Sequence, residues 1–255
     1  MARVLSKLHA AGAKAVLIGD SEQLQPIDAG AAFRAIAERI GYQELTGIRR
    51  QQALWQREAS RDFARGDTPK ALDRYHQNGA IRFAATREQA KDQLLRDWSQ
   101  HRGRYPEKDH LILAHTRADV AELNHGAREA LKERGELGSD VRVETRRELA
   151  RDDGAVAIER GERNFAAGDR VMFLKNDREM DVKNGTLGTI LQVDQSSTRV
   201  AVDGIEQREI SFAFSDYAAL DHGYAATVHK AQGATVDRYL FWRHRIWTAT
   251  WHTSE

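Results

Sequence analysis

The chain has 255 residues, of which 41% are hydrophobic and 30% charged, and its formal net charge is +1. This length suits one large domain or two smaller ones, and the near-neutral charge excludes a global basic field that attracts nucleic acid. Cysteine is absent, which excludes disulfides and thiolate metal sites and fits a cytoplasmic protein. No apolar run approaches the roughly 18 residues that span a bilayer, so we expect no membrane contact.

The first half of the chain alternates between helical and strand patterns. Apolar residues recur at helical spacing in residues 2–12. Residues 14–20 contain a continuous apolar run at 15–18 and end in Gly-Asp, which predicts a buried parallel strand. Helical patterns return at residues 29–40, 52–66 and 87–102.

A second short buried strand is predicted at residues 111–114, and a helix follows it. Thr116 can cap this helix, with Asp119 three residues later as an acidic variant of the capping box. Because buried strands alternate with helices, the sequence predicts an α/β fold with a parallel sheet.

From about residue 140, short segments of period two are separated by Gly and Asp, which predicts a small antiparallel β module. The segments are 141–144, 156–159, 170–174, 188–193, 199–202 and 209–212. Residues 225–230 return to the α/β pattern. Residues 238–255 hold three of the five Trp and lack apolar periodicity, so we expect an aberrant tail there.

Two strings in the first half carry groups suited to phosphate chemistry. GDSEQLQPI at residues 19–27 places an Asp and the amide of Gln23 just past a predicted parallel strand, where α/β sheets bind ligands. LTGIRRQ at residues 45–51 offers Arg50, a planar permanent cation for a phosphoryl group. The alternatives are a plain turn and a solvated Arg pair.

The strongest string is GYAATVHKAQG at residues 223–233. Its small Ala and Gly residues let the backbone approach phosphates, and its polar residues can donate to them. A weaker string, HTRAD at residues 115–119, offers Thr116 and Arg117 to phosphates. The alternatives are a buried strand with a Gly turn for the first string, and a helix cap or surface charge for the second.

Taken in chain order, these strings resemble those of RecD-like superfamily 1 DNA helicases, most of all the TraA-type (Ti-type) conjugative transfer relaxases. The resemblance covers residues 1–237. Residues 19–27 resemble motif III, with Gln25 where many members have Pro. Residues 45–51 resemble motif IV, and residues 223–233 resemble the family string Thr-Val-His-Lys-Ser-Gln-Gly. Residues 115–119, with Leu123 and Asn124, resemble the family segment where a strand end meets DNA. Residues 168–172 and 184–188 resemble an SH3-like β insertion, although Asn-Gly is also a hairpin signal by itself.

The resemblance implies a role for each matching residue. Gln23 and Arg50 act on the γ-phosphate as catalytic groups. The nucleotide cleft is formed by Gly19, Asp20, Gln23, Arg50, Gln232 and Gly233. The contacts to single-stranded DNA come from Thr116, Arg117, Thr227, His229 and Lys230.

The resemblance also implies a RecA-like, P-loop NTPase-type architecture. We expect the C-terminal part of a first RecA-like domain at residues 1–45 and a second RecA-like domain at residues 46–162 and 213–237. An SH3-like β-barrel insertion is expected at residues 163–212, before the tail at residues 238–255. The family's later Leu-Ser/Thr-Arg motif is absent, and a frameshift is the simplest explanation of the tail.

Other family features are missing from the sequence. It has no Gly-x-x-x-x-Gly-Lys-Ser/Thr string and no Asp-Glu pair, which would cradle phosphate and hold Mg²⁺. The nicking Tyr and the metal-binding His cluster of relaxases are also absent, so we expect no metal site. Met1 is therefore interpreted as an internal Met used as a start.

The functional hypothesis is a fragment of an ATP-dependent helicase, 5′ to 3′ by resemblance, that acts in conjugative plasmid transfer. ATP and Mg²⁺ belong to the parent protein, and we expect neither to bind tightly to this chain alone. Its partners are single-stranded DNA and the missing N-terminal RecA-like half. The alternatives are a non-enzymatic module that binds single-stranded DNA or docks a partner, and a remnant without function.

Overall fold

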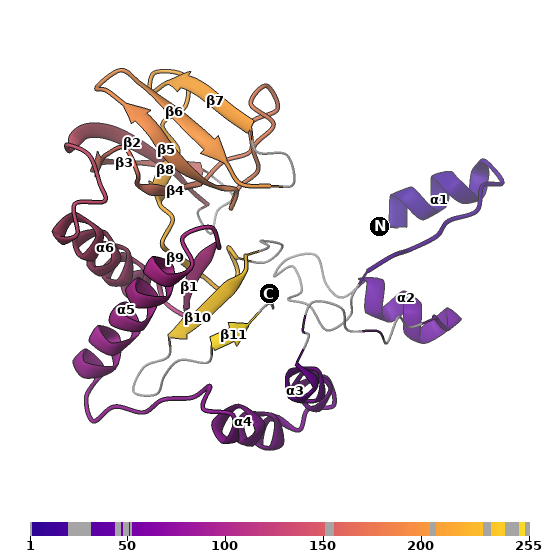
Figure 1. Ribbon diagram of the computed structural model, residues 1–255. Coiled ribbons are helices and arrows are strands. Elements are labelled where there is room, and N and C mark those ends of the chain that lie inside the picture. Colours follow the sequence, from indigo (N-terminus) through magenta and orange to yellow (C-terminus); the bar gives the residue numbers. More distant parts are fainter. Residues whose placement is uncertain are drawn as a thin grey trace.

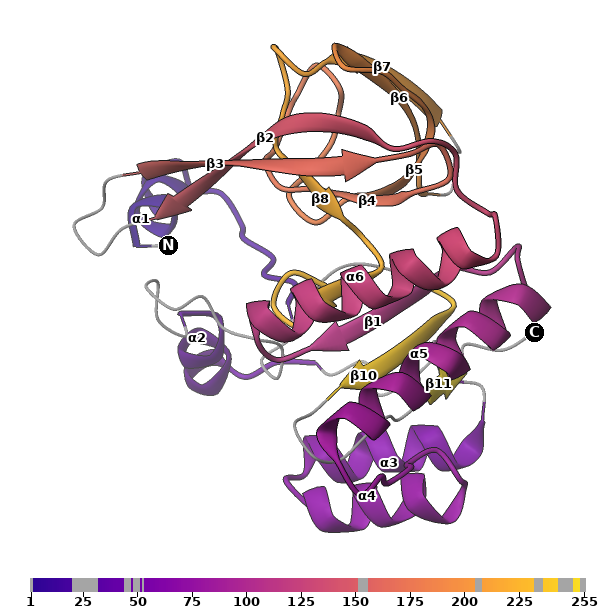
Figure 2. The same ribbon diagram turned by 90° about the vertical axis from the view of Figure 1, so that its left-hand side faces the viewer.

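The structure is a computed structural model that describes residues 2–19, 32–43, 47, 51, 53–150, 156–204, 208–231, 236–242 and 250–252. A mostly parallel sheet and its helices form one part of the body, and an antiparallel β module forms the other (Figures 1 and 2). The predicted α/β class is therefore confirmed. In the described part of the chain, no helix is long and apolar enough to cross a membrane.

The N-terminal residues contain two helices, α1 (Ala2–Ala10) and α2 (Ala32–Ile40), as their periodicity predicts. The strand predicted at residues 14–20 is wrong for residues 14–19, which form none, and Val16 and Ile18 are 83% and 91% exposed. A strand needs neighbouring strands to pair its backbone, and no described strand lies beside these residues. This segment lies apart from the body in Figure 1.

A helical hairpin follows, made of α3 (Leu54–Ala64) and α4 (Thr68–Gln77). The 52–66 pattern predicts α3, whereas α4 was missed. Its start signal was present, because the side chain of Asp67 accepts a hydrogen bond from the N–H of Lys70, with a proline in the first turn. The two helices bury Tyr75 between them.

The sheet of the α/β part has the strand order β11-β10-β1-β9. Its strands are β1 (His110–Ala114), β9 (Ala225–Thr227), β10 (Arg238–Trp242) and β11 (Thr250–His252). β1 is parallel to β9 and to β10, and β11 is antiparallel. The expected aberrant tail at residues 238–255 stays a prediction, but its first residues, Arg238–Trp242, form a strand of this sheet.

The reason is that β10 lies between two other strands and is buried on alternate residues. Leu240 and Trp242 are 0% and 1% exposed. A strand in the middle of a sheet needs apolar and aromatic residues but no long-range periodicity. The aromatic content that set this segment apart is thus what makes it a sheet strand.

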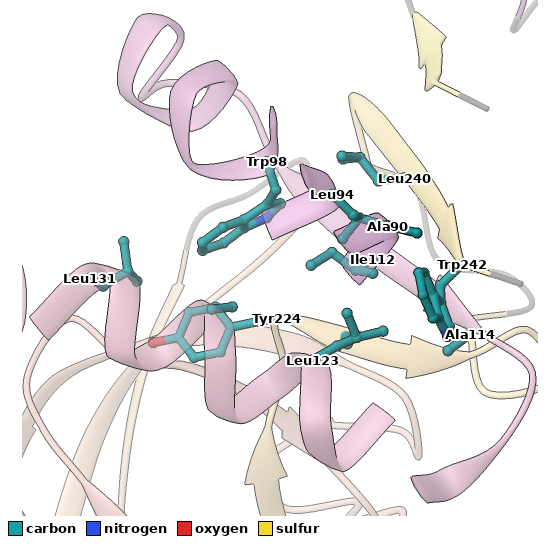
Figure 3. Close-up of a cluster of buried hydrophobic side chains, with 12 residues drawn as sticks. Ala90, Leu94, Trp98, Ile112, Ala114, Leu123, Leu131, Tyr224, Leu240 and Trp242 are labelled. Atoms are coloured by element: carbon teal, nitrogen blue, oxygen red, sulfur yellow. The ribbon is translucent and has the colours of Figure 1, made fainter. Parts of the chain in front are cut away.

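Helices α5 (Arg87–Arg104) and α6 (Arg117–Glu133) cover one face of this sheet. Figure 3 shows their apolar side chains meeting Ile112 and Leu240 from the strands. Trp98 meets Tyr224 edge-to-face, with ring centroids 5.8 Å apart. Leu111 and Ala226 belong instead to a cluster with Met172 and Leu187 of the β module.

The β module, residues 141–222, consists of a hairpin and a five-stranded antiparallel sheet. The hairpin pairs β2 (Val141–Ala150) with β3 (Val156–Phe165) and extends beyond the sheet in Figure 2. The sheet order is β7-β6-β5-β4-β8. Its strands are β4 (Arg170–Phe173), β5 (Leu187–Val193), β6 (Ser197–Val202), β7 (Arg208–Ala213) and β8 (Leu220–His222). All six predicted segments fall on strands, β8 was missed, and the SH3-like barrel stays a prediction.

Candidate functional site

The carboxyl ends of β1 and β9 lie at the same edge of the parallel sheet. Ala114, the last residue of β1, is in register with Thr227, the last residue of β9. The N–H of Val228 donates to the carbonyl oxygen of Ala114 at 3.2 Å. The predicted DNA-contacting residues lie at or just after these two strand ends, so the fold gathers two segments far apart in the sequence at one edge.

After β9 the chain makes a single turn from Thr227 to Ala231. The N–H of Ala231 donates to the carbonyl oxygen of Thr227 at 3.0 Å, and the N–H of Lys230 reaches the Thr227 hydroxyl at 3.4 Å. His229 is exposed, whereas Thr227 and Lys230 are half-buried. Thr227 therefore shapes the turn that presents His229 and Lys230, and its own hydroxyl is partly engaged.

After β1, Thr116 caps α6. Its hydroxyl oxygen accepts a hydrogen bond from the N–H of Asp119 at 3.0 Å and donates to the Asp119 carboxylate at 2.6 Å. The cap reading of Thr116 is thus confirmed, and the Thr116 hydroxyl is not free to donate to a ligand. Arg117 is exposed at the positive end of the helix dipole, where an anion is favoured.

The Asp119 carboxylate is itself neutralised. Arg87 of α5 donates to it at 2.7 Å. Burial raises the pKa of Asp119, but the hydrogen bonds from Thr116 and Arg87 outweigh it and hold the pKa below its usual range. Asp119 therefore stays ionised and paired, so it repels an approaching phosphate less than a free carboxylate would.

Asn124 of α6 braces the start of β9. The N–H of Ala225 donates to Oδ1 of Asn124 at 2.8 Å, and Nδ2 of Asn124 donates to the carbonyl oxygen of Ala225 at 3.3 Å. Asn124 is 6% exposed and Ala225 is 1% exposed. Because β9 ends the sheet order, the amide satisfies the backbone on the edge that has no described strand.

A buried ionic cluster holds the residue before β9. The hydroxyl of Tyr224 donates to Asp169 at 2.6 Å, and Arg128 of α6 donates to the same carboxylate from Nε and Nη2, each at 3.0 Å. Asp169 is 0% exposed. Burial lowers the pKa of Arg128, but the hydrogen bonds to Asp140 and Asp169 raise it above its usual value, so the guanidinium stays charged.

The Asn184–Gly185 turn of the β module packs against the turn after β9. Gly185 has φ +94°, and its N–H donates to the carbonyl oxygen of Phe173 at 2.8 Å. A Cβ placed on Gly185 would lie 2.9 Å from the carbonyl oxygen of Lys230. Gly185 is thus needed both for the hairpin and for close approach to the candidate site.

Most of the predicted nucleotide cleft lies outside the described residues. These are Asp20, Gln23, Arg50, Gln232 and Gly233. Gly19 is described, and a Cβ on it would lie 3.1 Å from the ring of Phe33 in α2. Gly19 is therefore used for packing here, and its role toward a nucleotide stays a prediction. The described residues contain no group of three or more metal-ligating side chains.

Sequence reasoning assigned no site role to the residues that hold the site in place, namely Asn124, Arg128, Asp169 and Tyr224. A signal existed, because Asn124 and Arg128 are four residues apart on the same side of α6 as Leu123 and Leu131. Polar residues that interrupt an apolar helix face are buried and need partners. This signal alone names no partner.

Several known proteins are similar in sequence to this chain. A family model described as "AAA domain" matches residues 1–86. The chain is 44% identical over 239 residues to "Probable conjugal transfer protein TraA" of Sinorhizobium fredii, covering 93% of this chain and 20% of that protein. It is 30% identical over 237 residues to "ATP-dependent RecD2 DNA helicase" of Deinococcus radiodurans, covering 88% and 28%.

The solved structures that are similar to the chain include a Bacteroides Pif1 helicase in complex with ADP-AlF3 and ssDNA. Its TM-score is 0.46 at 19% identity, over 78% of this chain and 45% of that chain. The chain spans only 20% of the length of the TraA relative.

Proposed function

Since this chain is homologous to one segment of the TraA conjugal transfer proteins and, more distantly, to superfamily 1 helicases, we propose that it is the DNA-gripping part of an ATP-dependent helicase. The whole protein unwinds or translocates along DNA during conjugative plasmid transfer. The observation that carries this proposal is the meeting of two candidate contact segments at one sheet edge, Thr116–Arg117 after β1 and Thr227–Lys230 after β9.

The chemistry of this edge suits a phosphodiester backbone. Arg117 and Lys230 supply cations, and the start of α6 supplies the positive end of a helix dipole. Ala225 and Ala226 place no bulky side chain beside the turn. Because these contacts address phosphates and not base edges, we propose binding of single-stranded DNA without strong sequence preference.

ATP and Mg²⁺ act in the proposed whole protein, where ATP hydrolysis supplies the free energy for translocation. The sequence holds neither the phosphate-cradling string nor the Asp-Glu pair. We therefore propose that an N-terminal RecA-like half binds the nucleotide and is the partner of this chain. In this proposal residues 1–45 complete that half, Gln23, Arg50 and Gln232 reach the nucleotide from this side, and residues 163–212 form an SH3-like insertion.

The direct test measures binding of a fluorescein-labelled oligo(dT) to the full chain by fluorescence anisotropy over a series of salt concentrations. Log K is expected to fall linearly with log salt, and Lys230→Ala is expected to reduce the slope by about 0.7. Lys70→Ala is the matched control, because Lys70 lies on α4 and pairs with Asp62. Absence of binding at low salt, or an equal effect of both variants, contradicts the proposal.

A second candidate function is a DNA-binding module without enzymatic activity. It is favoured because both candidate DNA-contact segments, Thr116–Arg117 and Thr227–Lys230, belong to this chain. ATP hydrolysis separates the two. The helicase proposal expects almost none from the chain alone and DNA-stimulated hydrolysis once the N-terminal half is added. If adding the N-terminal half does not increase ATP hydrolysis, the result favours the non-enzymatic module. Substantial ATP hydrolysis by the chain alone contradicts the proposal that the N-terminal half binds the nucleotide.

A further inference from the structure

We propose that Asn124 is a positioning residue that fixes the register of β9 and thereby sets the turn that contacts single-stranded DNA. This inference rests on the proposed function for its ligand. It assigns to Asn124 no contact with DNA. Two hydrogen bonds between the side-chain amide of Asn124 and the backbone of Ala225 hold the strand that leads into this turn.

By itself β9 is a weakly held strand. The strand has three residues, Ala225–Thr227, and pairs only with β1 among the described strands. Two of its three side chains are those of Ala, so they add little packing. A short, small-residue strand is prone to slippage, and a slip of one residue moves every side chain to the opposite face.

The amide of Asn124 selects one residue of β9 as its partner. Its oxygen accepts from the N–H of Ala225, and its nitrogen donates to the carbonyl oxygen of the same residue. A donor and an acceptor in fixed order match one residue only. Any slip would leave the buried polar groups of both Asn124 and Ala225 without partners, which is costly.

Helix α6 connects both candidate contact segments. The helix begins at Arg117, beside the Thr116 cap, and carries Asn124 about two turns later. Arg128, one turn further, holds Asp169 and through it the hydroxyl of Tyr224. One rigid helix therefore fixes where the segment after β1 and the segment after β9 lie relative to each other.

Two variants of the full chain test the inference. Asn124→Ala removes both hydrogen bonds, and Asn124→Asp keeps the acceptor but turns a carboxylate toward the carbonyl oxygen of Ala225. Amide hydrogen exchange of the peptide 224–231 is expected to be about tenfold faster in both, with exchange in β5 and β6 unchanged. His125→Ala, at the exposed next position of α6, is expected to leave exchange unchanged.

Oligo(dT) binding supplies the readout that a general loss of stability does not give. Both Asn124 variants are expected to bind about tenfold more weakly with an unchanged salt slope, because no phosphate contact is removed. A changed slope overturns the positioning role in favour of a direct one. Unchanged exchange at 224–231 overturns it outright.

The exchange measurement needs no DNA, so it decides the role of Asn124 even if the parent chain does not bind oligo(dT). Failure of the parent chain to bind oligo(dT) would contradict the proposed function but not the positioning role of Asn124. If Asn124→Ala does not fold, Asn124→Asp decides both readouts.

Discussion

Replacing Arg128 by Met is expected to destabilise the protein strongly. The substitution keeps most of the aliphatic volume but removes the partner of a carboxylate that is 0% exposed. Asp169 would retain the hydroxyl of Tyr224 and the N–H of Ala166 as donors but no cation. Breaking a buried ion pair in this way costs about 3–5 kcal/mol.

The magnitude is dominated by Asp169. The second carboxylate partner of Arg128, Asp140, is 32% exposed and keeps its contact with Lys132, so losing it adds little. For a protein of this size, each kcal/mol lowers Tm by about 2–4 °C, so a decrease on the order of 6–20 °C is expected. Urea unfolding followed by tryptophan fluorescence measures the change, since Trp98 contacts Tyr224.

Arg134→Met is the matched control at the C-cap of the same helix, because the side chain of Arg134 is 42% exposed and its contacts with Glu136 and Ser99 lie at the surface. Its effect is expected to be within about 1 kcal/mol. Adding Asp169→Asn to Arg128→Met removes the unpaired charge and is expected to restore part of the loss. Equal effects of the two Arg variants, or no recovery in the double variant, would refute the reasoning.

Three further predictions follow from single contacts. Thr116→Ala is expected to cost about 1 kcal/mol in urea unfolding, and Thr116→Ser much less. Gly185→Ala is expected to cost about 1–3 kcal/mol and to weaken oligo(dT) binding, because it pushes on Lys230; Gly79→Ala, with φ +65° and open space around it, is the control without a clash. Burial lowers the pKa of His222 from 6.5, so the unfolded state binds its proton first as pH falls. Stability is therefore expected to decrease below about pH 6.5, and urea midpoints of His222→Gln should depend less on pH.

Local patterns predict much of the fold. The helical spacing of apolar residues identifies α1, α3 and α5, and the period of two identifies the strands of the β module. These signals act over a few residues. The elements of the α/β sheet and the β module bury the face that their patterns indicate, whereas α1 buries no residue. The capping signal at Thr116 is also local, and it is confirmed.

The errors come from partners that no local pattern names. Residues 14–19 are apolar enough for a buried strand, yet Val16 and Ile18 lie exposed because no described strand pairs with them. Arg238–Trp242 was set apart for its composition, yet it pairs with β1. In both cases the deciding quantity is a pairing between distant segments.

The candidate site shows the same division. Thr227, His229 and Lys230 stand out in the sequence because their string is unusual. Asn124 has no predicted contact there, and its importance follows from its hydrogen bonds to Ala225. Groups that touch a ligand can be predicted from their chemistry, whereas groups that hold them in place are found through geometry.

The position of β10 has a consequence for how the protein is made. Asp109, next to β1, and Asp237, next to β10, are joined by a hydrogen bond although 128 residues separate them. During synthesis β1 is made long before β9 and β10, so it has neither of its parallel neighbours until those later strands have left the ribosome. Such distant pairings form slowly, and the apolar strand is exposed to aggregation in the meantime. A premature stop before Arg238 would remove β10 and leave one edge of β1 unpaired.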